Sequence, residues 1–188
     1  MNPSHVGREQ IIENNIAALG SPSMKALDHE QFIALGKFLG FPSLLDTFPS
    51  FKRMRKGGSV YHSLSYKQVT ARNSSSVLFQ DNGPHFGQID FYFQYKLPCG
   101  NNLTCTGYCV CPVKNLALVY ALPRVLGFAF IEDPITFATG QQLTVVYARE
   151  KVIMIIPISA VKEKLVYMQC EGEEVAFVSR FPNRVKSD

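Results

Sequence analysis

The chain has 188 residues, of which 46% are hydrophobic and 18% are charged, so it has the apolar content of a folded domain and not of a disordered tail. Its 14 phenylalanines and 8 tyrosines favour a β-rich body. The formal net charge of +4 permits contact with nucleic acid, but it excludes the strongly basic character of a dedicated non-specific DNA-binding protein.

Residues 1–50 are predicted to form a short helical N-terminal extension. Within residues 8–19, the apolar side chains recur at helical spacing, and Gly20, Ser21 and Pro22 would then end the helix. These apolar residues are Ile11, Ile12, Ile16 and Leu19. The extension is too short to enclose a core of its own, so we expect it to dock on the body or to end a preceding domain.

A second helix is predicted from residue 28 to residue 40. Asp28 is a suitable N-cap, and Gly40 is a suitable stop. The segment places four large apolar side chains on one face: Phe32, Leu35, Phe38 and Leu39.

Residues 51–188 are predicted to form the main domain. From about residue 59 onward, apolar and polar residues alternate, and turn signals such as Asn82-Gly83 and Glu171-Gly172 separate the segments. Many short strands at this spacing indicate an antiparallel barrel, SH3-like or BAH-like, with seven to eight strands. A single helical or 3-10 turn is predicted within residues 157–165. The predicted strands are 59–68, 74–80, 87–96, 115–122, 142–149, 151–158, 164–171 and 173–181.

No catalytic signature occurs in the sequence. It contains neither H-E-x-x-H nor G-x-S-x-G, and it lacks the glycine-rich patterns that bind phosphates. Acidic residues are sparse in the middle of the body, where Asp81, Asp90, Glu132 and Asp133 form no convincing metal-binding set. We therefore expect that the protein is not an enzyme.

Four of the five cysteines lie within fourteen residues, at Cys99, Cys105, Cys109 and Cys111. Tetrahedral zinc sites use such thiolates, although they usually take them from two separated pairs, and here all four would come from one loop. Three interpretations stay open: a zinc site, a disulfide, or reduced thiols packed as small apolar groups. The spacing favours reduced thiols, and no cofactor is expected unless zinc binds here.

Basic residues gather at the two ends of the predicted body. If its first and last strands lie together, the two groups would form one patch able to neutralise several phosphates. The simpler interpretation is a basic linker on a solvated face. The candidate nucleic-acid-binding residues are Lys52, Arg53, Arg55, Lys56, Lys67, Arg72, Arg180, Arg184 and Lys186.

Residues 52–188 contain a Y-x-S-x-x-Y-K-x-x-x-x-R-N-S pattern, a G-x-I step and a terminal F-P-N. The residues of these motifs are Tyr61, Ser63, Tyr66, Lys67, Arg72, Asn73, Ser74, Gly87, Ile89, Phe181, Pro182 and Asn183. In these motifs the segment resembles the C-terminal β-rich domain of unknown function in CACTA-type transposase-derived proteins. The catalytic acidic residues of such a transposase have no counterpart in this chain. The resemblance therefore implies a non-catalytic module that binds DNA, chromatin or another protein.

Two functions remain as hypotheses. The first is a module that contacts nucleic acid or a chromatin protein through the basic patch. The second is a structural domain that forms homo-oligomers by pairing of strand edges. The N-terminus lacks a signal-peptide pattern, and no run of about 18 apolar residues predicts a membrane span. We therefore expect an intracellular, nuclear protein with no membrane partner.

Overall fold

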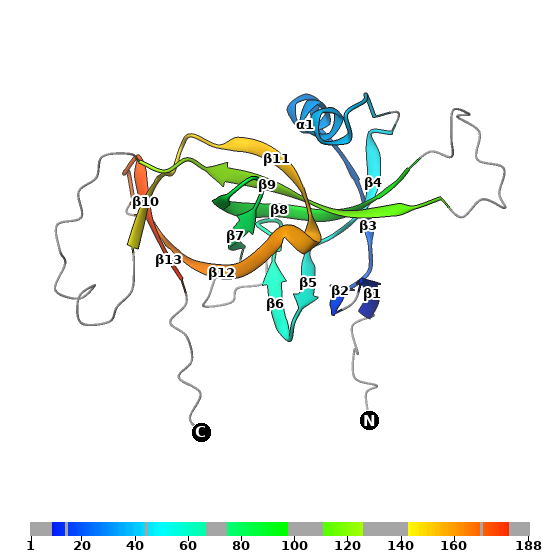
Figure 1. Cartoon of the computed structure of the whole chain (residues 1–188), viewed down its shortest axis with the longest axis horizontal. Helices are drawn as coiled ribbons and strands as arrows, with labels where there is room; N and C mark the ends of the chain where they lie inside the picture. Colours follow the sequence, from blue (N-terminus) through cyan, green and yellow to red (C-terminus); the bar gives the residue numbers. More distant parts are fainter. Residues whose placement is uncertain are drawn as a thin grey trace, which may run out of the picture.

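The computed structural model describes residues 9–13, 15–43, 45–66, 75–97, 111–125, 143–169 and 171–180. These residues form thirteen strands, one α-helix and one short 3-10 helix, and all the paired strands are antiparallel (Figure 1). The prediction of a mainly β, antiparallel protein is confirmed.

The predicted helix over residues 8–19 is wrong. The segment forms a hairpin of β1 (Glu9–Glu13) and β2 (Ile16–Leu19) instead. Asn15 turns the chain with a φ of 64°, a conformation that asparagine tolerates better than most residues. Ile16 and Ala18 point into the core, because β2 pairs with β5 (Arg53–Lys56).

The second predicted helix is confirmed as α1 (His29–Leu39). Asp28 caps its N-terminus through a capping box with Gln31, and Gly40 ends it with a φ of 79°. Leu35 is fully buried, and α1 packs over β11 (Val152–Pro157).

The eight predicted strands of the body are confirmed, with shifts of a few residues at their ends. The 3-10 turn, η1 (Ile158–Ala160), is also present. Two further strands, β3 (Ser23–Ala26) and β4 (Thr47–Phe51), come from the segment predicted to be helical. The remaining strands are β6 (Ser59–His62), β7 (Ser76–Gln80), β8 (Pro84–Lys96), β9 (Val113–Leu122), β10 (Leu143–Tyr147), β12 (Val161–Met168) and β13 (Val175–Arg180).

The strands form two sheets. A four-stranded sheet has the order β1-β2-β5-β6, and a nine-stranded sheet has the path β10-β13-β12-β7-β8-β4-β3. In the larger sheet, β9 pairs along one edge of β8 and also with β11, whereas β7 and β4 share the other edge of β8. Among the described strands no closed barrel is found, so an SH3-like or BAH-like fold is not confirmed.

The first fifty residues contribute strands to both sheets. β2 pairs with β5, and β4 pairs with β8, so strands from the predicted extension complete sheets of the predicted body. The boundary predicted after residue 50 stays a prediction, but β4 runs across it.

The core comprises three clusters of buried side chains. One lies between the four-stranded sheet and the nine-stranded sheet and includes Met54, Tyr61 and Tyr92. A second lies under α1 around Leu35. The third lies where β10, β12 and β13 meet β8 and includes Leu165. The first cluster holds β5 in place, and β5 carries three of the nine basic residues identified from the sequence, Arg53, Arg55 and Lys56.

Candidate nucleic-acid interface

β5 presents its basic side chains on two faces. Strand alternation places Arg53 and Arg55 on one face, and Met54 and Lys56 on the other. Met54 is fully buried in the core, so the register of β5 is fixed. Gly57 and Gly58, both with positive φ, then turn the chain into β6.

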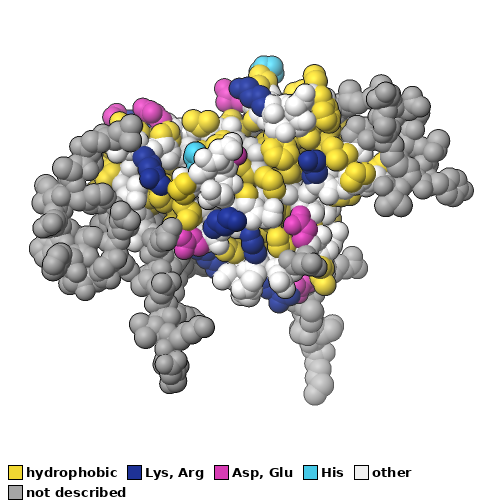
Figure 2. Space-filling view, in the orientation of Figure 1, with side chains coloured by type: hydrophobic (Ala, Val, Ile, Leu, Met, Phe, Trp, Pro, Cys, Tyr) yellow, Lys and Arg dark blue, Asp and Glu magenta, His cyan; other side chains and the backbone are white. Residues whose placement is uncertain are grey.

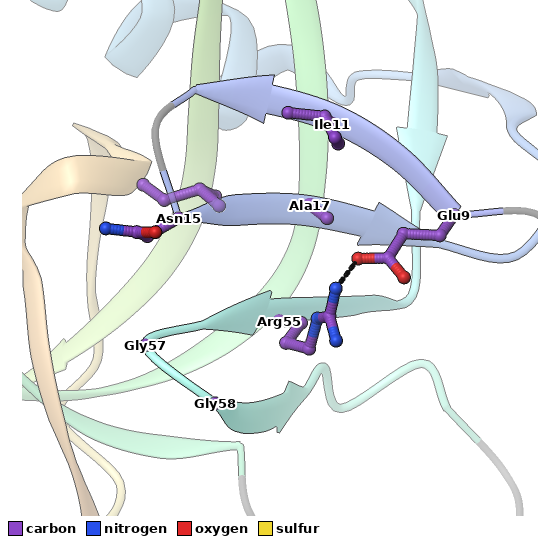
Figure 3. Close-up of a pocket in the computed structure, with 8 residues that line it drawn as sticks. Glu9, Ile11, Asn15, Ala17, Arg55, Gly57 and Gly58 are labelled. Carbon is purple, nitrogen blue, oxygen red and sulfur yellow. Dashed lines mark hydrogen bonds and ion pairs between the residues drawn. The ribbon is translucent and has the colours of Figure 1, made fainter.

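Arg55 is already paired. Its guanidinium forms an ion pair with Glu9, which reaches it across β2 from the edge strand β1. Figure 3 shows this pair at the rim of a shallow hollow of about 500 Å³ that is bordered by Ile11, Asn15 and the Gly57–Gly58 turn. The ion pair neutralises Arg55, so Arg55 contributes little to an anion-binding surface.

Lys56 is also engaged. Its Nζ donates hydrogen bonds to the carbonyl oxygens of Ser159, at 2.8 Å, and of Val161. Burial lowers the pKa of Lys56, the charge of Lys162 lowers it further, and Glu13 partly offsets both. Lys56 therefore ties the four-stranded sheet to the start of β12 and at the same time brings two positive charges together.

Arg53 lies over a pair of stacked aromatic rings. Its guanidinium carbon lies 5.0 Å from the centroid of the Tyr66 ring. The Tyr66 ring in turn stacks on His62, with centroids 4.8 Å apart and an interplanar angle of 6°. Arg53 and His62 are also cross-strand partners in the β5–β6 pair, so backbone pairing and ring stacking hold the three groups together.

β12 supplies two lysines that the sequence analysis did not single out. Lys162 is exposed, and a register shift between Val161 and Glu163 places it at a β-bulge. The Nζ of Lys164 lies 5.3 Å from the centroid of the Tyr61 ring. No local motif marks these lysines, because only the crossing of β12 beside β5 and β6 brings them to the site.

The charges of the two segments lie close enough to affect each other's pKa. Burial lowers the pKa of His62, and the charges of Arg53 and Lys164 lower it further. Burial also lowers the pKa of Lys164. In Figure 2, several Lys and Arg side chains gather in the middle of the drawn face, where Figure 1 places β12 beside β5 and β6. We call this set the basic cluster; it comprises Arg53, Lys56, Lys162 and Lys164, together with His62.

The other predicted contact residues do not join the basic cluster in the described structure. Lys52 is exposed beside Arg53. Arg180 ends β13, which pairs with β10 and β12 and not with β5, and its side chain lies outside the described part. Four more predicted residues also lie outside the described residues: Lys67, Arg72, Arg184 and Lys186. Among the described strands, β13 pairs with neither β5 nor β6, and the contact that Lys56 makes with the start of β12 brings β12 to the basic cluster instead.

The cysteines can be followed at one position. Cys111 is buried, with 6% of its surface exposed. Cys99, Cys105 and Cys109 lie outside the described residues. Within the described ranges, no group of three or more His, Cys, Asp or Glu side chains is placed to hold a metal ion. The three interpretations of the four cysteines, a zinc site, a disulfide and the favoured reduced thiols, therefore stay open.

A second polar group lies on the other side of β8, around Asp90. The register shift between Ile89 and Phe91 leaves Asp90 at a bulge opposite β9. Its carboxylate accepts a hydrogen bond from the Tyr120 hydroxyl at 3.2 Å. Burial raises the pKa of Asp90, although Tyr120 and two lysines, Lys25 and Lys151, oppose that rise. This environment costs stability when the carboxyl is ionised.

The substitution Asp90→Asn should raise stability near neutral pH, because the amide keeps an acceptor for Tyr120 and carries no charge to desolvate. A carboxyl whose pKa is raised in the folded state stabilises the fold below its ordinary pKa, and this contribution is lost as the pH rises through the raised value. The melting temperature of the variant should therefore exceed that of the wild type at pH 7, and the gap should close toward about pH 3. Thermal unfolding across this range measures the gap; a gap that is the same at every pH would contradict the assignment.

In the part of the chain that the structure describes, no helix has the length and apolar character needed to cross a membrane. Comparison of the chain with protein-family models, with curated proteins and with solved structures found no match.

Proposed function

We propose that this chain is a non-catalytic binding module that contacts nucleic acid through the basic cluster. The observation that supports the proposal is the proximity of like charges on β5, β6 and β12: burial lowers the pKa of Lys56 and of His62, and the neighbouring charges of Lys162, and of Arg53 with Lys164, lower them further. Positive charges held together repel one another, and a polyanion that binds across them relieves this repulsion. A row of phosphates is such a partner, and its binding would release counterions.

The exposed members of the cluster are suited to this role. Lys162 is exposed, and Arg53 and Lys164 are half-buried with their charged ends on aromatic rings, which restricts their motion. Lys52 adds a further exposed charge beside Arg53. Arg55 and Lys56, in contrast, are already occupied by Glu9 and by backbone carbonyls.

The proposal also includes a barrel-like arrangement of the strands and a relationship to CACTA-type transposase-derived proteins. A bridge between Arg124 and Val146 links the chain that follows β9 to β10, which supports a barrel-like arrangement of the body. Tyr61 and Tyr66, two residues of the pattern that resembles CACTA-type transposase-derived proteins, lie at the basic cluster. Membership of that family and a nuclear location would both fit a module that binds nucleic acid.

Binding of a fluorescently labelled DNA, followed by anisotropy in a salt series, tests the proposal. The affinity should fall steeply with salt, and Lys162→Ala with Lys164→Ala should weaken binding about 10-fold and flatten the salt dependence. The matched control is Lys37→Ala with Arg149→Ala, which removes the same charge from α1 and from an exposed ion pair with Glu174. Absence of binding at low salt, or an equal loss in the control, would refute the proposal.

The alternative, homo-oligomerisation through strand edges, is less well supported. Within the described residues, β1 is an outer strand of its sheet, and Ile11 is 79% exposed. An antiparallel pair of β1 strands centred on Ile11 would place Glu9 opposite Glu13 of the second copy, and like charges directly opposite are destabilising. We therefore expect a monomer mass in light scattering; a dimer abolished by changes in β1 would favour the alternative.

A further inference from the structure

The aromatic stack at the basic cluster is built before any ligand arrives. His62 ends β6, and the backbone N–H of Tyr66 donates to the carbonyl of Ser63 at 3.1 Å, which folds the chain back so that the two rings face each other. The Arg53 guanidinium on Tyr66 adds a third flat group. His62 and Tyr66 are each half-buried.

These groups match the two parts of an unpaired nucleotide. An accessible flat ring offers a stacking surface for a base, and the nearby lysines offer charge for the adjoining phosphates. A base pair inside a duplex keeps both faces stacked on its neighbours and presents only its edges and the phosphate backbone. A site of aromatic faces and positive charge therefore discriminates in favour of a strand whose bases are free.

We propose that the basic cluster binds single-stranded nucleic acid, with a base stacked on the His62–Tyr66 pair and the flanking phosphates on Arg53, Lys162 and Lys164. This inference rests on the proposed function and narrows its ligand. Stacking does not depend on base identity, because every base has a flat face, so little sequence preference is expected.

The electrostatics of His62 fit a stacking role. Its lowered pKa keeps the imidazole neutral at pH 7, so the ring acts there as a flat π surface and not as a third cation. The positive charge comes from Arg53 on β5 and from Lys164 on β12, which add to the effect of burial on the pKa of His62. The chain thus separates the two tasks: the rings stack, and the cations bind phosphate.

The test compares labelled oligothymidylate and oligouridylate of about 12 nucleotides with a DNA duplex of the same phosphate count. The single strands should bind about 10-fold more tightly than the duplex. His62→Ala should reduce single-strand binding about 10-fold and leave duplex binding nearly unchanged, whereas His62→Phe, which keeps a flat ring, should retain the preference. The DNA and RNA strands, which share phosphates and base faces, should differ little.

Equal affinity for strand and duplex, or equal losses in His62→Ala and His62→Phe, would overturn the inference while leaving salt-dependent binding, and hence the proposed function, intact. No binding of any of the three probes at low salt would overturn both. Thermal unfolding of each variant separates loss of the site from loss of the fold, and His62→Phe supplies the comparison if His62→Ala is unstable.

Discussion

Replacing Gly87 by alanine is expected to lower the free energy of unfolding by about 2–3 kcal/mol. A Cβ at this position would lie 2.5 Å from Cγ1 of Val119, 2.9 Å from a ring carbon of Phe79 and 3.0 Å from the carbonyl oxygen of Tyr120. Val119 and Phe79 are fully buried, and the Tyr120 oxygen belongs to the backbone of β9, so none of the three can move away freely.

Gly36→Ala provides the matched control for Gly87→Ala. Gly36 lies inside α1, where an added Cβ would approach the Phe41 carbonyl oxygen only to 3.7 Å, an ordinary contact. Alanine is favoured over glycine in a helix interior by up to about 1 kcal/mol, so the same substitution should stabilise here. Urea unfolding measures both, and equal midpoints for Gly87→Ala and the wild type would contradict the close packing of β8 on β9 and β7.

Reversing the charges of β12 is expected to abolish measurable binding. Lys162→Glu with Lys164→Glu removes two phosphate contacts and adds two repulsive charges, so the affinity for single-stranded DNA at low salt should fall by about 100-fold or more. The control is Lys37→Glu with Arg149→Glu, which changes the net charge equally at positions away from the basic cluster. Anisotropy titrations of both double variants measure the difference.

The same charge reversal has a signature that needs no ligand. Lys164 lowers the pKa of His62, so replacing it by a carboxylate should raise that pKa, because a nearby negative charge stabilises the imidazolium. The titration of the His62 ring protons, followed by NMR, reports the shift. An unchanged His62 pKa would show that β12 does not lie beside β6 as described, independently of any binding result.

Local patterns in the sequence were sufficient for most of the body and for α1. The strands β6 to β13 follow period-2 alternation between turn signals. The turn between β7 and β8 needs positive φ values, which Asn82 and Gly83 adopt readily. α1 follows from Asp28 and Gly40, whose capping roles depend only on neighbouring backbone. These features depend on interactions between residues that are close in the sequence, so they can be predicted from one sequence alone.

The β1–β2 hairpin was mispredicted because its apolar residues fit two periods. Ile11, Ile12, Ile16 and Leu19 have helical spacing, but Ile16 and Ala18 also alternate, and pairing of β2 with β5 buries both. The local signal for the hairpin was the Asn14-Asn15 pair, a turn-forming sequence. Tertiary pairing overrode the helical pattern, because the strand buries its apolar face against a partner more than thirty residues away.

The sequence by itself determined that residues 52–56 carry concentrated positive charge and that β-strands follow them. The tertiary structure alone decided which of those charges are available. Glu9 neutralises Arg55, backbone carbonyls bind Lys56, and β12 adds Lys162 and Lys164 from over a hundred residues along the chain. Charge availability depends on what lies within a few ångströms in space, and strand pairing between distant segments sets those neighbours.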